Sequence, residues 1–268
     1  MNRIQALFTE KTDPVLSIYF TAGHPEPHSA AEIIQRLADA GADMIEIGMP
    51  FSDPMADGPV IQKSSDTALR NGMSLATLFG ELKDIRREVR IPLLLMGYLN
   101  PVMQYGFARF CEDCERTGID GVILPDLPLE IYTGDPAPVA QNLSGSLMDL
   151  FGAHGLEHIF LISPQTSDRR IREIDRLGRG FIYMVSSSAT TGMKSGFGPE
   201  QTAYFERIRD MQLQHPILTG FGISNPDTFQ AACRYTRGAI IGSAFVRYLE
   251  TENWREGIPA FLQSIRGK

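Results

Sequence analysis

Short apolar segments recur along the whole chain and alternate with amphipathic segments, and this alternation constrains the fold more than any other feature. Almost every residue within them is apolar. The eight segments are 15–23, 44–48, 91–98, 119–125, 158–163, 180–186, 216–222 and 238–244. Near-continuous apolar character is typical of strands that are buried on both faces, as in a parallel sheet. The sequence therefore predicts eight parallel strands.

The segments between these apolar runs have the spacing of helices with one apolar face. Residues 29–41 place Ile33, Ile34 and Leu37 on one side, and residues 168–178 repeat the pattern. Glycine often ends a helix because it adopts the left-handed conformation at low cost. Glycines at the end of a helical segment, close to the start of the next apolar run, are Gly41, Gly118, Gly178 and Gly238.

Strand and helix alternate eight times without a linker, which predicts a (β/α)8 TIM barrel. Residues 1–11 add an extra N-terminal helix, and residues 1–268 are expected to form one domain. The alternative is a doubly wound open sheet. That fold usually carries a G-x-G-x-x-G pattern after its first strand, whereas YFTAGHPEP follows at 19–27. The length also fits the barrel, which typically has about 250 residues.

Charge and cysteine content narrow the class of protein. The net charge of −7 argues against nucleic acid or an anionic membrane surface as the main partner. No apolar run approaches the roughly 20 residues that a membrane span needs. The three cysteines, Cys111, Cys114 and Cys233, are too few for a disulfide framework, so a cytoplasmic location is expected. Cys111 and Cys114 share a helical segment without a second ligand pair nearby, so no metal site is expected.

Acidic residues gather in and just after the second apolar run. Glu46 lies inside the run MIEIG, and Asp53 and Asp57 follow on the next loop. Active sites of (β/α)8 barrels lie at the C-terminal ends of the strands. A carboxyl group buried in a strand has a raised pKa, whereas a loop acid near water stays ionised more easily. Glu46 and Asp57 are therefore predicted to be an acid/base pair. The alternative is a salt-bridged core residue and two acids that cap turns.

Small residues close the last two apolar runs. Gly222 ends the seventh, and Gly242 and Ser243 lie near the end of the eighth. In barrels of this kind, these loops and an adjoining helix N-terminus often bind phosphate through backbone N–H groups. The sequence therefore predicts a phosphate site, although the glycines could instead serve only tight turns.

Two segments are predicted to be long loops. Residues 186–198 are small and polar, with glycines that could act as hinges, and we interpret them as a lid that closes over a ligand. A plain surface loop is the alternative. Residues 133–146 are rich in proline, glycine and serine, and the sequence assigns them no role.

The segment IEIGMPFSDPMADG at 45–58 resembles the signature of the tryptophan synthase alpha chain family. The resemblance spans essentially the whole chain, in order. Further similar stretches are 20–25, 58–62, 98–102, 124–128, 160–167, 180–186, 220–224 and 242–246. It implies a retro-aldol cleavage of indole-3-glycerol phosphate into indole and glyceraldehyde 3-phosphate, in L-tryptophan biosynthesis. It implies no cofactor and no metal on this chain.

The resemblance also implies roles for single residues. Glu46 would be the general acid/base. Asp57 would accept a hydrogen bond from the indole N–H and stabilise positive charge in the ring, and Tyr183 would assist the proton transfers. The other matching positions are Phe20, Ile61 and Tyr98 in the indole pocket, Thr191 in the lid, and Gly192, Gly222, Gly242 and Ser243 at the phosphate.

The family pairs this chain with a pyridoxal-phosphate-dependent beta chain that receives indole through a tunnel, so an alpha2-beta2 complex is expected. The loops around 50–60 and 100–105 would face that partner. Many relatives carry arginine where this chain has Ser187 and glycine where it has Ala189, so lid closure is expected to differ in detail.

Two other functions are alternatives. One is a non-catalytic regulatory subunit that binds the phosphate ligand and only activates a partner. Loss of Glu46 or Asp57 would favour it, and both are present. The other is a different phosphate-binding barrel, such as an isomerase or indole-glycerol-phosphate synthase. That enzyme would need a catalytic lysine on a strand, and none of the eight apolar runs contains lysine.

Overall fold

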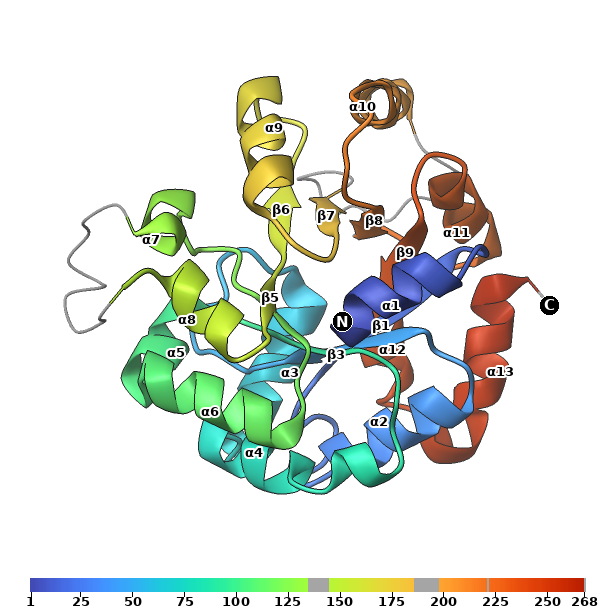
Figure 1. Cartoon of the computed structure of the whole chain (residues 1–268). Coiled ribbons are helices and arrows are strands. Elements are labelled where there is room, and N and C mark those ends of the chain that lie inside the picture. The colour runs from blue at the N-terminus through green and yellow to red at the C-terminus, as the bar shows by residue number, and fades with distance from the viewer. Residues whose placement is uncertain (135–144, 186–197, 221, 268) are drawn as a thin grey trace.

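A nearly closed parallel barrel forms the centre of the molecule. The computed structural model describes residues 1–134, 145–185, 198–220 and 222–267 (Figure 1). Within them, nine parallel strands form one sheet in the order β5-β4-β3-β2-β1-β9-β8-β7-β6. The strands are β1 (Val15–Thr21), β2 (Met44–Gly48), β3 (Leu93–Met96), β4 (Gly121–Ile123), β5 (Glu157–His158), β6 (Phe160–Ile162), β7 (Ile182–Val185), β8 (Ile217–Gly220) and β9 (Gly238–Ile241).

The two ends of the sheet are consecutive in the chain. Only Ile159 separates β5 from β6, so the chain itself joins the two edges and brings the sheet round into a barrel. Apart from Glu157, both pieces come from the fifth apolar run, 158–163. The prediction of a (β/α)8 barrel is confirmed, and the ninth strand arises because the fifth barrel strand is interrupted.

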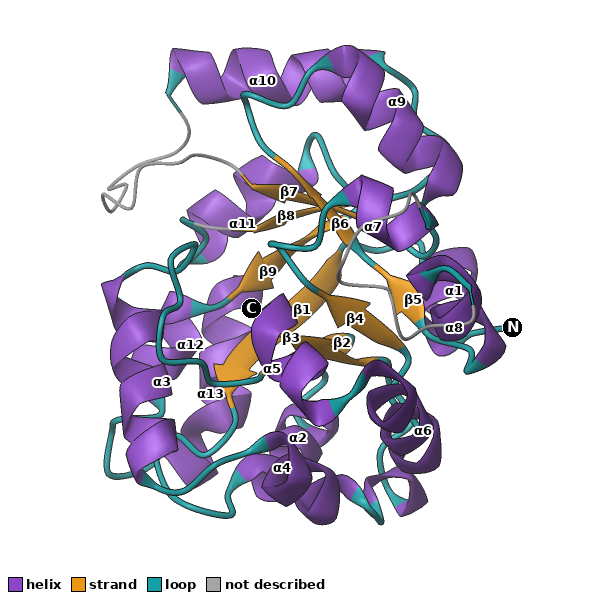
Figure 2. Cartoon of the chain, turned by 90° about the vertical axis from the view of Figure 1, so that its left-hand side faces the viewer, coloured by secondary structure: helices purple, strands orange, loops and turns teal. Residues whose placement is uncertain are grey.

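Helices surround the strands (Figure 2), and α9 and α10 lie on the opposite side of the barrel from α2 and α4. The helices are α1 (Arg3–Glu10), α2 (Ala30–Asp39), α3 (Pro59–Arg70), α4 (Leu75–Leu82), α5 (Leu99–Tyr105), α6 (Phe107–Thr117), α7 (Leu129–Thr133), α8 (Leu147–Ala153), α9 (Asp168–Leu177), α10 (Pro199–Asp210), α11 (Pro226–Cys233), α12 (Ser243–Tyr248) and α13 (Trp254–Arg266). No helix in the described ranges is both long enough and apolar enough to cross a membrane.

The predicted helix-ending glycines behave in different ways. Gly41 and Gly118 have positive φ values of 89° and 74°, as expected for left-handed caps. Gly178 caps α9 in an extended conformation with φ −67°, so the left-handed role predicted for it is wrong. Gly238 lies beyond the end of α11 and begins β9, where an added Cβ would collide with the Val15 backbone. Close backbone approach, and not a helix cap, requires glycine there.

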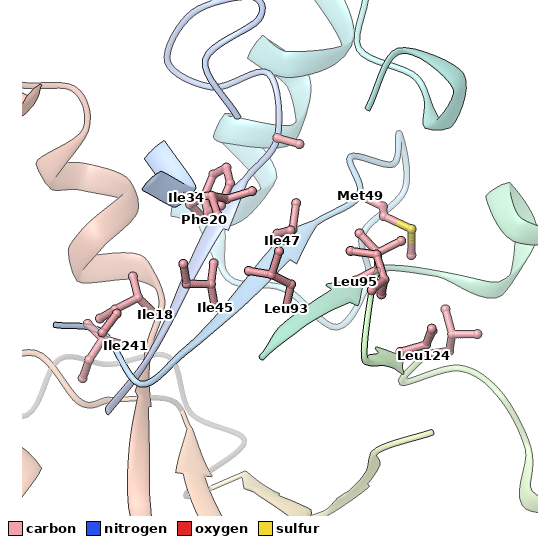
Figure 3. Packing of buried hydrophobic residues seen from close by; sticks show 14 of the residues in the cluster. Ile18, Phe20, Ile34, Ile45, Ile47, Met49, Leu93, Leu95, Leu124 and Ile241 are labelled. Atoms are coloured by element: carbon pink, nitrogen blue, oxygen red, sulfur yellow. The ribbon is translucent and has the colours of Figure 1, made fainter. Parts of the chain in front are cut away.

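Successive residues of β1 point to opposite sides of the sheet, as in any strand. Ile18 and Phe20 belong to the large core between the barrel and its helices, and Figure 3 shows them with Ile34 of α2. Val15 and Tyr19 belong to a smaller cluster inside the barrel. This alternation decides which side chains of each strand can reach the site.

Helix α1 closes the N-terminal end of the barrel. Ile4 is fully buried in the inner cluster, together with Val15. The Asn2 amide donates hydrogen bonds to the Asp120 and Gly155 carbonyl oxygens, and Arg3 pairs with the Asp120 carboxylate at 2.8 Å. The predicted N-terminal helix therefore seals one end, and the C-terminal ends of the strands form the other end.

Candidate active site

Glu46 is buried inside the barrel. It lies in β2, where strand alternation turns its side chain away from the outer core that holds Ile45 and Ile47, and its exposed fraction is 0%. Oε1 accepts a hydrogen bond of 2.9 Å from the Ser17 hydroxyl, and Oε2 has no hydrogen-bond partner among the described residues. Burial raises the pKa of Glu46 to about 8, and the Ser17 hydrogen bond opposes that rise. The group can therefore hold or release a proton near neutral pH.

Asp57 lies on the loop between β2 and α3, held by Tyr98. The Tyr98 hydroxyl donates a hydrogen bond of 2.7 Å to Asp57 Oδ2 and accepts one of 3.0 Å from the Ala56 N–H. Burial raises the pKa of Asp57 above its ordinary value, and the Tyr98 hydrogen bond opposes the rise. The loop acid is therefore less open to water than the sequence predicts, because the half-buried carboxylate packs against the barrel mouth.

Tyr183 comes from β7 on the far side of the barrel interior. Its side chain passes over Gly220 of β8, where an added Cβ would collide with the tyrosine hydroxyl, so glycine makes room for it. Burial raises the pKa of Tyr183, and the nearby charges of Glu46 and Asp57 raise it further. The structure thus brings together the three side chains that the sequence predicts to be catalytic.

The predicted pocket wall needs one correction. Ile61 of α3 is buried in the inner cluster, as expected of a pocket residue. Phe20 is not a pocket residue, because it faces the outer core with Ile34 and is fully buried there. Its neighbour Tyr19 takes the inner place, and lines a small cavity together with Asp57 and Tyr98.

A shift of one residue along a strand moves a side chain to the opposite face of the sheet, which explains the error at Phe20. Tyr19 is therefore the cavity-lining residue that the sequence prediction omitted. Alternation along the first apolar run could have identified it, because every second residue of a strand lies on the same face. Tyr19 shares the inner face with Ser17, and Phe20 shares the outer face with Ile18.

The predicted phosphate residues follow β8 and β9. Gly222 has a positive φ of 75° and is exposed. Gly242 directly follows β9, and Ser243 begins α12. A Cβ built on Gly242 would lie 3.7 to 4.0 Å from the Tyr19 ring, so Gly242 borders the same end of the barrel as the pocket. Thr191, Gly192, Ser187 and Ala189 lie outside the described residues, as does most of the loop 133–146.

A family model described as "Tryptophan synthase alpha chain" matches residues 6–261. The chain belongs to the tryptophan synthase alpha chain family. A protein of that name from Parabacteroides distasonis is 54% identical over 267 residues, which cover 99% of this chain and 100% of the relative. Another, from Flavobacterium psychrophilum, is 52% identical over 265 residues with the same coverage.

Solved structures agree with these sequence matches. Tryptophan synthase subunit alpha from Legionella pneumophila has a TM-score of 0.84 and is 32% identical, covering 100% of this chain and 98% of that chain. Members of the family are lyases of tryptophan biosynthesis that cleave indole-3-glycerol phosphate and act with a beta chain. The family and the lyase activity predicted from the sequence are therefore confirmed.

Proposed function

We propose that the residues brought together at the barrel mouth perform the cleavage of indole-3-glycerol phosphate, with Glu46 as general acid/base and Asp57 as a fixed negative charge. The observation that carries this assignment is Glu46 itself. It is a carboxyl group inside a barrel, fully buried and without a salt bridge among the described residues. Such burial costs stability, and a functional group is the usual reason for it.

The reaction moves one proton in and one proton out. Protonated Glu46 donates its proton to C3 of the indole ring, which gives the ring a positive charge. Asp57 accepts a hydrogen bond from the indole N–H and stabilises that charge. The carbon–carbon bond then breaks, its electron pair returns to the ring, and the hydroxyl on the departing carbon becomes an aldehyde. Glu46, now a carboxylate, takes the hydroxyl proton and is regenerated.

Tyr98 and Tyr183 support these two acids. Tyr98 fixes the Asp57 carboxylate and stands in the wall of the cavity, where an indole ring would stack or pack. Burial keeps Tyr183 neutral, so its hydroxyl can donate a hydrogen bond to the substrate while protons move. Tyr19 and Ile61 supply the remaining apolar wall.

The direct test of this function is to mix the chain with indole-3-glycerol phosphate and measure indole release, with and without a beta chain. A catalytic chain releases indole on its own. A chain that binds substrate without releasing indole, but raises the rate of a beta chain, would be the regulatory subunit instead.

The phosphate group of the substrate is proposed to bind at Gly222, Gly242 and Ser243. Their position after β8 and β9 supports this, because these loops bind phosphate in many barrels. Gly242→Asp should weaken substrate binding and raise KM strongly, because the new carboxylate repels the phosphate and occupies its space. Calorimetric titration with glycerol 3-phosphate, which carries the phosphate without the indole, provides the measurement.

Gly242→Asn is the matched control, because it adds the same volume without the charge. We expect it to weaken binding less than Gly242→Asp does. A Cβ at this position meets only ordinary van der Waals distances, so both variants should fold. Equal affinity of Gly242→Asp and the unmodified chain for glycerol 3-phosphate would contradict the assigned phosphate site.

The beta chain is proposed to dock on the loops at 50–60 and 100–105, in an alpha2-beta2 complex. A groove of about 420 Å³ runs between these loops and α4, lined by apolar residues that include Phe51, Met73 and Pro101. Met55 and Met103, which lie on the same two loops, have exposed side chains. We also propose that residues 1–268 form one barrel domain, which the single continuous sheet supports. A cytoplasmic location is proposed as well, and the three free thiols support it.

A further inference from the structure

Ser17 is the only hydrogen-bond partner that Glu46 has among the described side chains. It lies on the inner face of β1 and has an exposed fraction of 0%. The strand register pairs Ser17 with Met44, and Tyr19 with Glu46. The Glu46 side chain therefore reaches diagonally across the β1–β2 pair, toward the N-terminal end of β1, to accept the Ser17 hydrogen bond.

A serine is an unusual choice for this position. Interior positions of such barrels are mostly filled by valine, isoleucine and leucine. Here a hydroxyl group replaces a branched apolar side chain and its donor meets one carboxyl oxygen at 2.9 Å. The second oxygen, Oε2, is buried and has no hydrogen-bond partner among the described residues. One oxygen is thus anchored and the other is left for a ligand.

We propose that Ser17 is a positioning residue for the reaction, whose hydroxyl anchors Glu46 Oε1 so that Oε2 exchanges protons with the substrate. This inference rests on the proposed role of Glu46. It adds a residue that neither touches substrate nor belongs to the acids and tyrosines described above. A buried carboxyl group held at one oxygen loses fewer orientations than a free one when the substrate arrives.

The hydrogen bond also acts on protonation. The titratable groups near Glu46 are Tyr19, on the same strand as Ser17, and Tyr183 on β7. Asp57 acts on the same two tyrosines, and Leu94, the β3 neighbour of Glu46, is apolar. None of these groups carries a positive charge. The Ser17 hydroxyl therefore favours the ionised carboxylate, against the effect of burial. Losing the hydroxyl raises the pKa of Glu46 further.

Ser17→Ala tests the proposal with a change of one atom. We expect kcat for indole release to fall about 10-fold or more, the range for a lost hydrogen bond to an ionised group. KM should change little, because Ser17 does not contact the substrate. The alkaline limb of the kcat/KM profile should move to higher pH. Ser17→Thr keeps the hydroxyl, so its kcat and the pH of its alkaline limb should match those of the unmodified chain.

Thr219→Val is the matched control. It removes another fully buried strand hydroxyl, which bonds to Thr236 on the side of β8 away from the barrel interior. The control should leave kcat and the pH profile unchanged, even if it lowers stability. Should Ser17→Ala not fold, Ser17→Cys offers the same readouts, because a thiol fills the space but donates only weakly.

The outcomes separate this inference from the proposed function. If the unmodified chain releases no indole, the proposed function fails first. If it releases indole with an alkaline limb, and Ser17→Ala keeps both kcat and that limb, Ser17 only fills space and the inference is wrong. The inference is also wrong if Ser17→Ala lowers kcat without moving the alkaline limb and Ser17→Thr does not restore kcat, because a merely structural defect has that signature.

Discussion

Glu46→Gln is expected to lower kcat for indole release by about 10²–10⁴-fold, the usual contribution of a positioned acid/base group. The amide keeps the volume and can still accept the Ser17 hydrogen bond, but it cannot donate a proton to C3 of the indole ring and recover another. Binding of glycerol 3-phosphate should be retained, because Gly242 and Ser243 are untouched. Single-turnover indole release and calorimetric titration measure the two effects separately.

Glu157→Gln is a matched control for this substitution. Glu157 is also a buried strand carboxyl, 3% exposed, and burial raises its pKa to about 7. It lies on β5 beside Gly180, in the end of the barrel that α1 closes. Activity should survive its replacement. Near-normal turnover of the Glu46→Gln variant, or equal losses in both variants, would contradict the catalytic role assigned to Glu46.

At alkaline pH, Glu46→Gln should be more stable than the unmodified chain. Burial raises the folded-state pKa of Glu46 from 4.5 to about 8, so the folded protein holds a proton that the unfolded chain releases. The stability from this proton is fully present below pH 4.5 and is lost as the pH rises through about 8. The difference is on the order of 5 kcal/mol. Urea unfolding of Glu46→Gln and the unmodified chain at both ends of this window measures it.

Asp57→Asn is expected to lower kcat by about 10²–10³-fold, the range for removing one group that stabilises developing charge. The amide oxygen can still accept the Tyr98 hydrogen bond, so the loop should keep its shape. A neutral amide cannot balance the positive charge on the protonated indole ring. Steady-state kinetics that resolve kcat from KM provide the measurement.

Asp53→Asn is the control on the same loop. Asp53 is exposed and accepts a hydrogen bond from its neighbour Ser52, away from the cavity that Asp57 lines. In the isolated chain it should leave kcat nearly unchanged. If Asp57→Asn raised KM and left kcat alone, Asp57 would only bind the substrate, and its assigned role in the cleavage would be wrong.

The barrel and its acids could be predicted from the sequence because burial leaves a strong pattern. Strands covered on both faces read as apolar runs, so a glutamate in such a run stands out. The interruption at Ile159 was not predicted, because the apolar run 158–163 continues through it without a break in the pattern. The prediction of left-handed Gly178 failed because an extended glycine can end a helix equally well.

Contacts between segments far apart in the chain depend on strand register and on loop packing, which composition does not encode. Tyr98 was expected near the substrate, but its hydrogen bond to Asp57 joins residues 41 positions apart. The Ser17–Glu46 hydrogen bond depends in the same way on the β1–β2 register. The error at Phe20 has a simpler origin. Tyr19 and Phe20 are consecutive aromatic residues, and only strand parity separates the pocket from the outer core.

The pH dependence of kcat/KM for indole release, measured on the unmodified chain from about pH 5 to pH 10, reports the protonation states of Glu46 and Asp57, because this ratio depends on groups of the free enzyme. The proposed cleavage requires protonated Glu46 and ionised Asp57. It therefore predicts a fall with an apparent pKa near 8 as Glu46 loses its proton. The matching rise as Asp57 ionises lies on the acid side of that fall, because burial raises the pKa of Asp57. A ratio that stays constant or rises through this alkaline range would contradict the account.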